Sequence, residues 1–314
     1  MKFGIAVTTS VPPAVTESSQ RDYVEKVSVA AESAGYDSVW VSDRTVFPSD
    51  LVAKYPDRFG HGKGDPRAQN VLEALTTLSY VAGLTKKVRL GTSVLVLPFR
   101  NPVLNSKMVA TLDVLSGGRL ILGVGTGWMP EEFSAMNADF RSRGNVSDEH
   151  LEYFLESCKS AIPVYKGTHL RIEGMKVYPQ AHQKPSPPIW VGGNSRAAMR
   201  RAAKYANGWH GIRLTPEELV HSLRKLKNIC DEEGRDIHDI EISLRSTVSL
   251  GEPHRDPSGD RLPLTGKIES IQSDLVAYQE AGLDYLVISM AGDSTQQVVE
   301  SVSKFTSDVA ENFL

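Results

Sequence analysis

Short apolar runs rich in valine and isoleucine alternate along the chain with stretches in which apolar residues recur every three or four positions. The short runs predict strands, and the longer stretches predict helices. Eight strands are expected, at Lys2–Val7, Asp37–Ser42, Val88–Leu97, Arg119–Gly123, Pro188–Gly192, Gly208–Arg213, Ile240–Ser246 and Tyr285–Met290. Helices are expected between them, at Asp22–Ala34, Asn70–Gly83, Pro102–Leu115, Glu131–Met136, Ser147–Tyr165, Ser195–Ala206, Pro216–Glu233, Ile268–Ala281 and Ser294–Asn312.

This alternation predicts a parallel sheet with helices packed outside it. Eight strand–helix units close naturally into a (β/α)8 barrel of the TIM type, and 314 residues suit one such α/β domain spanning 1–314. An open doubly wound sheet is the alternative, although such sheets rarely hold so many units in one layer.

Four connections are too long to be simple turns. Loops longer than about 12–15 residues are usually functional or disordered. Each of the four contains or follows the C-terminal end of an expected strand, the face on which barrel active sites lie, so they are predicted as insertions around a site. They are Asp43–Arg67, Gly125–Val146, Lys166–Pro187 (with a short hairpin at Gly167–Val177) and Leu250–Lys267. The apolar residues that form either an entrance or the packing of a lid are Phe47, Tyr55, Phe59, Phe133, Met136 and Phe140.

Composition narrows the class of protein. Hydrophobic residues make up 40% of the chain and the net charge is −3, which gives no electrostatic reason to expect nucleic acid or an anionic membrane as a partner. The N-terminus lacks the pattern of a signal peptide. Cys158 and Cys230 lack metal-type spacing and are expected to be buried free thiols, which suits a cytoplasmic location.

The sharpest motif is Gly192-Gly193-Asn194-Ser195, which follows an expected strand and opens an expected helix. Two glycines allow the backbone to approach a ligand closely, and free amides at a helix start attract anions. The motif therefore predicts a phosphate site. A tight turn with a serine cap and no ligand is the alternative.

Two further glycine-rich segments interrupt strands. Gly91-Thr92-Ser93-Val94 predicts either a bulge on which a flat ring can rest or a packing glycine. Gly123–Trp128 is not a dinucleotide fingerprint, because its sixth position is Trp128 rather than glycine and no helix follows at once. Its Gly125 and Thr126 are expected beside a planar ligand with Trp128 as a wall, or else in a flexible loop.

Polar side chains stand at several strand ends. Asp43 and Arg44 end the second strand and either orient a ligand or form an internal ion pair. No cluster with metal-ligand spacing and no nucleophile elbow occurs, so no metal site is predicted. Other polar residues, each expected to be structural or exposed when taken alone, are His61, His210, Arg213, Arg245 and His254.

Taken together and in this order, these stretches resemble the bacterial-luciferase-like oxidoreductase superfamily. The resemblance is close in VWVSDR (39–44), in LGTSVLVLPFRNPVLNSKMVATLDVLSGGRLILGVGTGW (90–128) and in PPIWVGGNSRAAMRRAAKYANGW (187–209), and it extends more weakly from residue 1 to about 211.

The resemblance implies a barrel that binds a reduced flavin or the deazaflavin coenzyme F-420. It implies that the 192–195 loop holds the cofactor phosphate and that the ring rests on a bulge in the third strand. In the family this bulge often contains a non-prolyl cis peptide, which maps onto Ser93–Val94. By this mapping the cofactor-binding residues are Thr92, Ser93, Val94, Gly125, Thr126, Gly192, Gly193, Asn194 and Ser195, and the catalytic candidates are Asp43, Arg44 and Trp128.

The implied function is that of a luciferase-like monooxygenase that uses reduced FMN and dioxygen on a small organic substrate. Hydride transfer with the deazaflavin F-420 is the close alternative, and a non-catalytic flavin-binding protein is a distant one. Well-studied deazaflavin dehydrogenases have Asp-His where this chain has Asp43-Arg44, and often a carboxylate in place of Trp128, which argues against sugar-phosphate dehydrogenase chemistry. The resemblance further implies a homo-oligomer, and a separate flavin reductase is a candidate partner.

Overall fold

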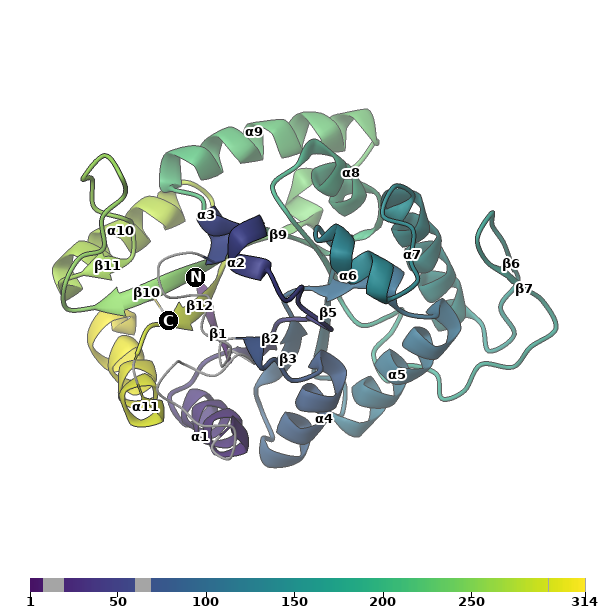
Figure 1. Ribbon diagram of the computed structural model, residues 1–314, viewed down its shortest axis with the longest axis horizontal. Coiled ribbons are helices and arrows are strands. Elements are labelled where there is room, and N and C mark those ends of the chain that lie inside the picture. Colours follow the sequence, from purple (N-terminus) through teal and green to yellow (C-terminus); the bar gives the residue numbers. More distant parts are fainter. Residues whose placement is uncertain (8–19, 60–68, 293, 314) are drawn as a thin grey trace.

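The computed structural model describes residues 1–7, 20–59, 69–292 and 294–313. Its parallel strands follow one another around a ring, and the last pairs back with the first, which closes a barrel (Figure 1). In order around the ring they are β1 (Lys2–Ala6), β2 (Ser38–Val41), β3 (Arg89–Thr92), β5 (Leu120–Gly125), β8 (Ile189–Gly192), β9 (Gly208–Ile212), β10 (Glu241–Leu250) and β12 (Tyr285–Met290). The predicted (β/α)8 TIM barrel is therefore confirmed.

The third predicted strand, Val88–Leu97, is broken in its middle. β3 ends at Thr92, and β4 (Leu95–Val96) resumes the pairing with β5 before a 3-10 turn, Leu97–Phe99. Between β3 and β4, the peptide bond from Ser93 to Val94 is cis, as the resemblance implied. The break turns this segment into the bulge at the mouth of the barrel.

The outer ring consists of helices whose ends follow local capping chemistry. The first is α1 (Gln20–Ser33), and the others are α4 (Ala74–Leu84), α5 (Pro102–Leu115), α7 (Arg143–Lys159), α8 (Arg196–Tyr205), α9 (Pro216–Glu232), α10 (Ile268–Glu280) and α11 (Thr295–Lys304). α4 begins later than predicted because Glu73 caps it, accepting a hydrogen bond from the amide of Thr76 at 2.7 Å. A π-helical turn, Phe305–Val309, and a 3-10 turn, Glu311–Phe313, replace the last part of the predicted terminal helix.

Alternation along the strands separates two apolar layers. Val39 and Val41 point outward into the large core beneath the helices, whereas Trp40 points into the barrel. Inside the barrel Trp40 packs on Trp190 with ring centroids 4.9 Å apart and meets Tyr285 edge-on. These bulky side chains fill the barrel below its C-terminal face, so a ligand site has to lie above them.

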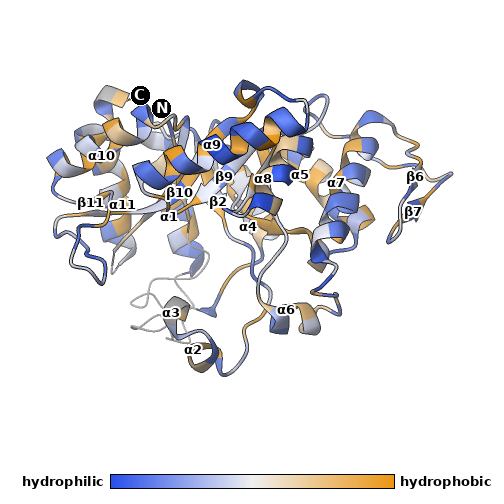
Figure 2. Cartoon of the chain, turned by 90° about the horizontal axis from the view of Figure 1, so that it is seen from above, coloured by the Kyte–Doolittle hydropathy of each residue, from blue (hydrophilic) through white to orange (hydrophobic). Residues whose placement is uncertain are grey.

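Three short helices stand above the C-terminal face: α2 (Leu51–Lys54), α3 (Pro56–Phe59) and α6 (Pro130–Ala135). Figure 2 shows all three projecting from the same side of the barrel. They belong to the first two predicted insertions. In the fourth insertion, β11 (Thr265–Gly266) extends the sheet beside the end of β10.

The prediction that Lys166–Pro187 lies at the C-terminal face of the barrel was wrong. Its hairpin, β6 (Tyr165–Lys166) with β7 (Arg171–Ile172), follows α7 and leads into β8. A helix-to-strand connection lies at the end where strands begin, so the hairpin is away from α2, α3 and α6 (Figure 2). The length of a loop alone does not show its side of the barrel; its place between a helix and the following strand does.

Both cysteines are free and buried, as expected. Burial raises the pKa of the Cys158 thiol to about 11. Across the described residues, no helix is both long enough and apolar enough to span a membrane.

Candidate functional site

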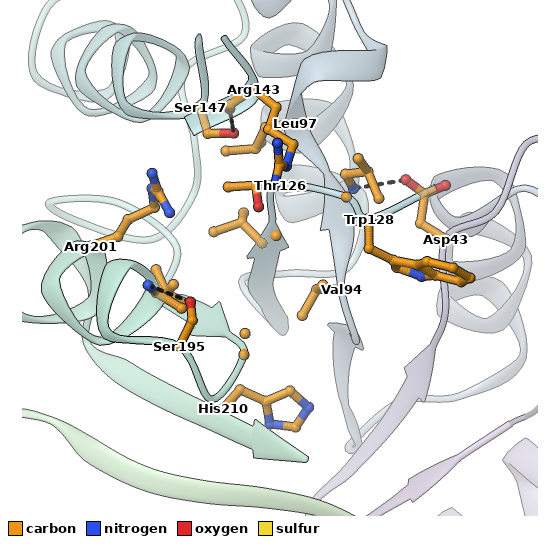
Figure 3. Close-up of a pocket in the computed structure, with 18 of the residues that line it drawn as sticks. Asp43, Val94, Leu97, Thr126, Trp128, Arg143, Ser147, Ser195, Arg201 and His210 are labelled. Atoms are coloured by element: carbon orange, nitrogen blue, oxygen red, sulfur yellow. Dashed lines mark hydrogen bonds between the residues drawn. The ribbon is translucent and has the colours of Figure 1, made fainter. Parts of the chain in front are cut away.

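A cavity of about 820 Å³ opens at the C-terminal ends of the strands. Figure 3 shows Ser195 and Arg201 on one side of it, Asp43 and Trp128 on the other, Val94 between them and His210 below. Its volume lies within the range of small-molecule and cofactor sites, about 300–1,000 Å³. Apart from Thr92, each residue that the resemblance mapped to the site lines this cavity.

One end of the cavity is built for an anion. Gly193 has a φ of +118°, a conformation that suits glycine, and turns the chain from β8 into α8. Ser195 caps α8 by accepting a hydrogen bond from the amide of Ala198 at 3.2 Å. The first amides of this helix therefore face the cavity end with their partial positive charge.

The side chain of Asn194 fixes the position of the loop at this end. Its Nδ2 donates to the carbonyl of Ile212 at 2.9 Å, and its Oδ1 accepts from the amide of Ile212 at 3.0 Å. The side-chain amide thus joins the 192–195 loop to the end of β9. Both ends of the amide are engaged, so the side chain first holds the loop in place.

Two arginines reinforce the anion end. Arg143 opens α7 and lies over the ring of Phe140 at 3.9 Å, and within the described residues no carboxylate pairs with it. Arg201 is paired with Asp148 at 2.6 Å. Both line the cavity, and the sequence prediction named neither (Figure 3). Arg143 fell within the predicted insertion Gly125–Val146 without a motif around it, and Arg201 lies inside a helix. Helical spacing places Arg201 on the same face as Ala198, a signal that was available.

Val94 forms the middle of the cavity wall. A Cβ atom on Gly125 would lie 2.5 Å from Val94 Cγ2, and one on Gly192 would lie 2.6 Å from Val94 Cγ1. Gly125 was expected beside a planar ligand, and Gly192 was expected to bring the backbone close to a phosphate. Both make room for the side chain of Val94, which becomes the raised surface on which a flat ring can rest.

Thr92 is the exception among the mapped residues. It is fully buried, its hydroxyl donates to the carbonyl of Gly123 at 2.6 Å, and it does not line the cavity. Since adjacent strand residues point to opposite faces, Ser93 faces the cavity and Thr92 does not. Thr92 holds β3 against β5 beside the bulge, and its expected contact with a cofactor stays a prediction that its place behind the cavity wall does not favour.

Arg245 of β10 crosses the floor of the cavity. Its Nη1 donates to Ser42 Oγ at 2.7 Å, to the carbonyl of Ser93 at 2.9 Å and to Ser93 Oγ at 3.1 Å. It thereby ties β10 to the ends of β2 and β3. The sequence prediction treated Arg245 as structural, although its place in a strand, with Ser243 two residues before it, indicates a side chain inside the barrel.

His210 of β9 is neutral and has a defined tautomer. Because His210 Nδ1 donates to Ser243, Nε2 of the neutral ring is an acceptor, and the Ser93 hydroxyl, 2.9 Å away, donates to it. Ser243 Oγ donates to the carbonyl of Trp209 and accepts from His210 Nδ1 at 2.7 Å. Burial, with a contribution from Arg245, lowers the pKa of His210 to about 3. His210 therefore orients Ser93 and carries no charge at neutral pH.

At the other end of the cavity, Asp43 and Arg44 pair with different partners and not with each other. Asp43 accepts from Arg100 at 2.6 and 2.9 Å and from the amide of Val96 at 2.9 Å, so its carboxylate is fully engaged. Arg44 pairs with the buried carboxylate of Glu132. Asp43 thus anchors the segment after β4, and Arg44 anchors α6.

Trp128 belongs to an aromatic lid. Arg44 lies over its ring at 5.2 Å, Tyr55 meets it edge-on at 5.1 Å, and Phe59 stacks on it at 6.3 Å. The apolar residues predicted for the insertions pack on one another, on Trp128 and on Phe99, and none of them lines the cavity, which favours lid packing over an entrance. His254 is exposed, and His61 lies outside the described residues.

The arrangement fits a phosphorylated, planar cofactor. It offers helix amides and Arg143 at one end, a raised apolar surface at Val94 in the middle, and a guanidinium beneath. In the described part of the chain, no group of three or more His, Cys, Asp or Glu side chains is placed to hold a metal ion.

The sequence profile of the luciferase-like monooxygenase family matches residues 1–284. The chain belongs to this family. The fold, the cis bond at the bulge and the match over most of the chain agree, and the predicted membership among flavin- or deazaflavin-dependent oxidoreductases is confirmed.

Three relatives illustrate the range of the family. An uncharacterized protein of Mycobacterium tuberculosis (strain ATCC 25618 / H37Rv) is 32% identical over 68% of this chain and 74% of its own. The alkanal monooxygenase alpha chain of Photorhabdus luminescens is 23% identical over 80% of this chain and 64% of its own. An F420-dependent glucose-6-phosphate dehydrogenase of Amycolatopsis mediterranei is 29% identical over 71% and 65%.

Solved structures support the same fold. The monooxygenase RslO1 from Streptomyces bottropensis superposes with a TM-score of 0.81 at 19% identity, covering all of both chains. The oxygenating constituent of 3,6-diketocamphane monooxygenase from Pseudomonas putida, solved with FMN, gives a TM-score of 0.79 at 17% identity and covers 100% of this chain and 99% of its own.

Proposed function

We propose that this protein is a monooxygenase that uses reduced FMN and dioxygen to oxidise a small organic substrate. When bound, the flavin supplies the redox chemistry: one oxygen atom enters the substrate, the other leaves as water, and the flavin is oxidised. The chain's own residues bind the phosphate, support the ring and exclude water. Gly193, Ser195 and Arg143 are proposed to hold the phosphate, and Val94 the ring.

The observation that carries this choice is the state of the ionisable groups around the cavity. Asp43 is engaged by Arg100 and by the amide of Val96, and His210 is neutral with both ring nitrogens hydrogen-bonded. Neither is free to exchange a proton with a substrate hydroxyl. Hydride transfer from an alcohol needs such a base. Oxygen transfer does not require Asp43 or His210 to act as such a base.

Deazaflavin-dependent hydride transfer remains the second candidate, because the F420-dependent relative is 29% identical over 71% of this chain. An anion site and a ring support serve both cofactors. The two proposals differ in the cofactor that is bound and in whether dioxygen is consumed.

The deciding experiment is an anaerobic titration of the purified protein with reduced FMN and, separately, with reduced F-420. We expect micromolar binding of reduced FMN and at least tenfold weaker binding of F-420, a difference of about 1.4 kcal/mol or more. Admission of oxygen to the FMN complex should then change the rate of flavin reoxidation from its value in free solution. Tighter binding of F-420 would transfer the proposal to hydride transfer, and binding of neither would contradict both.

We also propose a separate flavin reductase as the source of reduced FMN, and a homo-oligomeric assembly. Activity should depend on an added reductase, and photoreduced FMN should replace it. Size-exclusion chromatography with light scattering tests the assembly.

A further inference from the structure

Arg245 has hydrogen-bond donors that the protein does not fully use. Nη1 is well bonded to Ser42 and Ser93, whereas Nε and Nη2 each reach only Ser289 Oγ, at 3.4 Å. Good N–H···O bonds are about 2.7–3.2 Å long. One edge of the guanidinium, Nε with Nη2, therefore lacks an acceptor at normal distance.

Its charge is also unbalanced. Among the described residues no carboxylate forms an ion pair with Arg245. Burial, together with the nearby Arg213, lowers the pKa of Arg245 to about 10, so the guanidinium is still protonated at neutral pH. A buried charge without a counter-ion is costly. The side chain is half-buried only because it borders the cavity, so an anion can reach it from there.

The position of this cation indicates which part of a ligand it meets. Nη1 contacts the carbonyl of Ser93, an atom of the same peptide that carries Val94. A planar ring resting on Val94 turns one face to the bulge and the other to the mouth of the cavity, where a substrate enters. Arg245 lies on the side of the bulge, so a bound ring lies between it and a substrate, and the guanidinium meets the ring first.

We propose that Arg245 binds the anionic pyrimidine edge of the reduced cofactor, at N1 and O2, and thereby makes the protein prefer the reduced form. This proposal rests on the proposed function. Two-electron reduction of a flavin leaves a negative charge shared between N1 and O2 near neutral pH, and the oxidised ring carries none. A planar guanidinium edge with two parallel donors matches two adjacent acceptors. Because His210 is neutral, Arg245 supplies the positive charge at this edge.

The test measures dissociation constants for oxidised and for reduced FMN, anaerobically, with wild-type protein and three variants. Arg245→Gln removes the charge and leaves a shorter polar side chain, which also gives up the Nη1 contacts to Ser42 and Ser93. Arg213→Gln removes the neighbouring exposed charge as a matched control, and Arg143→Gln removes a charge from the phosphate end. Circular dichroism melting reports folding, and Arg245→Lys, which keeps the charge, serves as a second variant. Where F-420 is the cofactor that binds, its two redox forms replace those of FMN.

We expect Arg245→Gln to weaken reduced FMN about tenfold or more and oxidised FMN less than about twofold. The two-electron potential of bound FMN should fall by about 30 mV for each tenfold change. Arg143→Gln should weaken both forms by the same factor, Arg213→Gln should change neither much, and Arg245→Lys should keep most of the preference.

Equal weakening of both forms by Arg245→Gln, or no weakening, would overturn the assignment of Arg245 while leaving the proposed function intact. So would unchanged cofactor binding accompanied by a selective loss of affinity for a small carboxylate such as benzoate, which would place the anion on the substrate. Failure of the wild-type protein to bind either cofactor in either redox form would overturn the proposed function itself.

Discussion

The side chain of Asn194 is bonded on both sides to the backbone of Ile212, while the neighbouring Ser195 caps α8. Adjacent residues of one motif thus hold the loop in place by different means. The sequence motif showed where an anion would bind, but it could not show which atoms remained free. That distinction decides which substitution tests the phosphate site.

Ser195→Asp should weaken FMN binding about tenfold or more while leaving riboflavin binding within about twofold. Aspartate is a good helix cap, so α8 should persist, and the added carboxylate repels only a ligand that bears phosphate. Fluorescence titrations with both ligands measure the contrast. An equal loss for FMN and riboflavin would place the phosphate elsewhere.

Asn194→Asp is the matched control for this substitution. An aspartate can accept from the amide of Ile212 but cannot donate to its carbonyl, so the variant should lose stability of about 1–3 kcal/mol. A change in ligand affinity at this position would therefore mix binding with the loss of the contact between the loop and β9.

At the scale of the elements, two ion pairs attach α6 to the lid and differ in burial. Glu132 is 1% exposed, and it accepts from Arg44 and from the amide of Thr45 at 2.7 Å. Glu131 pairs with Lys54 at 3.2 Å, and the side chains are 31% and 41% exposed. Removing one partner from a buried pair leaves an uncompensated charge, whereas exposed pairs contribute little.

Glu132→Ala should lower the free energy of unfolding by about 3–5 kcal/mol, because Arg44 is left without its carboxylate. Lys54→Ala, in the exposed pair, should change it far less, because exposed pairs contribute little. Urea denaturation of both variants makes the comparison. Similar small losses in both would show that the Arg44–Glu132 pair does not hold α6 to the segment after β2.

Strand positions could be read from the sequence because apolar runs and glycine turns are local signals. A break in the third strand could be expected from Gly91 and from the resemblance. That the strand would resume for only two residues, Leu95–Val96, could not be expected. The contacts of Arg245 and His210 could not be predicted from either residue taken alone. Only ring closure brings β2, β3, β9 and β10 to one layer, where Ser42, Ser93, His210 and Arg245 meet.

For the whole molecule, the buried neutral His210 links stability to pH. Its pKa is about 3 in the folded protein and about 6.5 in an unfolded chain. Between these values the unfolded chain binds a proton that the folded protein does not, so stability is complete above pH 6.5 and falls as the pH is lowered.

Between pH 7.5 and 5.5 the wild-type protein should therefore lose about 1 kcal/mol more stability than His210→Gln, whose side chain does not titrate. Denaturation curves at the two pH values give the difference for each protein. His150, whose pKa is also lowered by burial, is present in both and cancels. Parallel losses in the two proteins would contradict a neutral, buried His210 in the folded state.

Val94, Gly125 and Gly192 come from three separate stretches of the chain, and the bulk of the first fills the space left by the other two. For anyone reshaping this cavity by directed evolution, the three positions behave as one. An alanine introduced at 125 or 192 alone collides with Val94, and a smaller residue at 94 alone leaves a hole. Libraries that vary the three codons together can reach new ring supports that stepwise mutagenesis would discard at its first round.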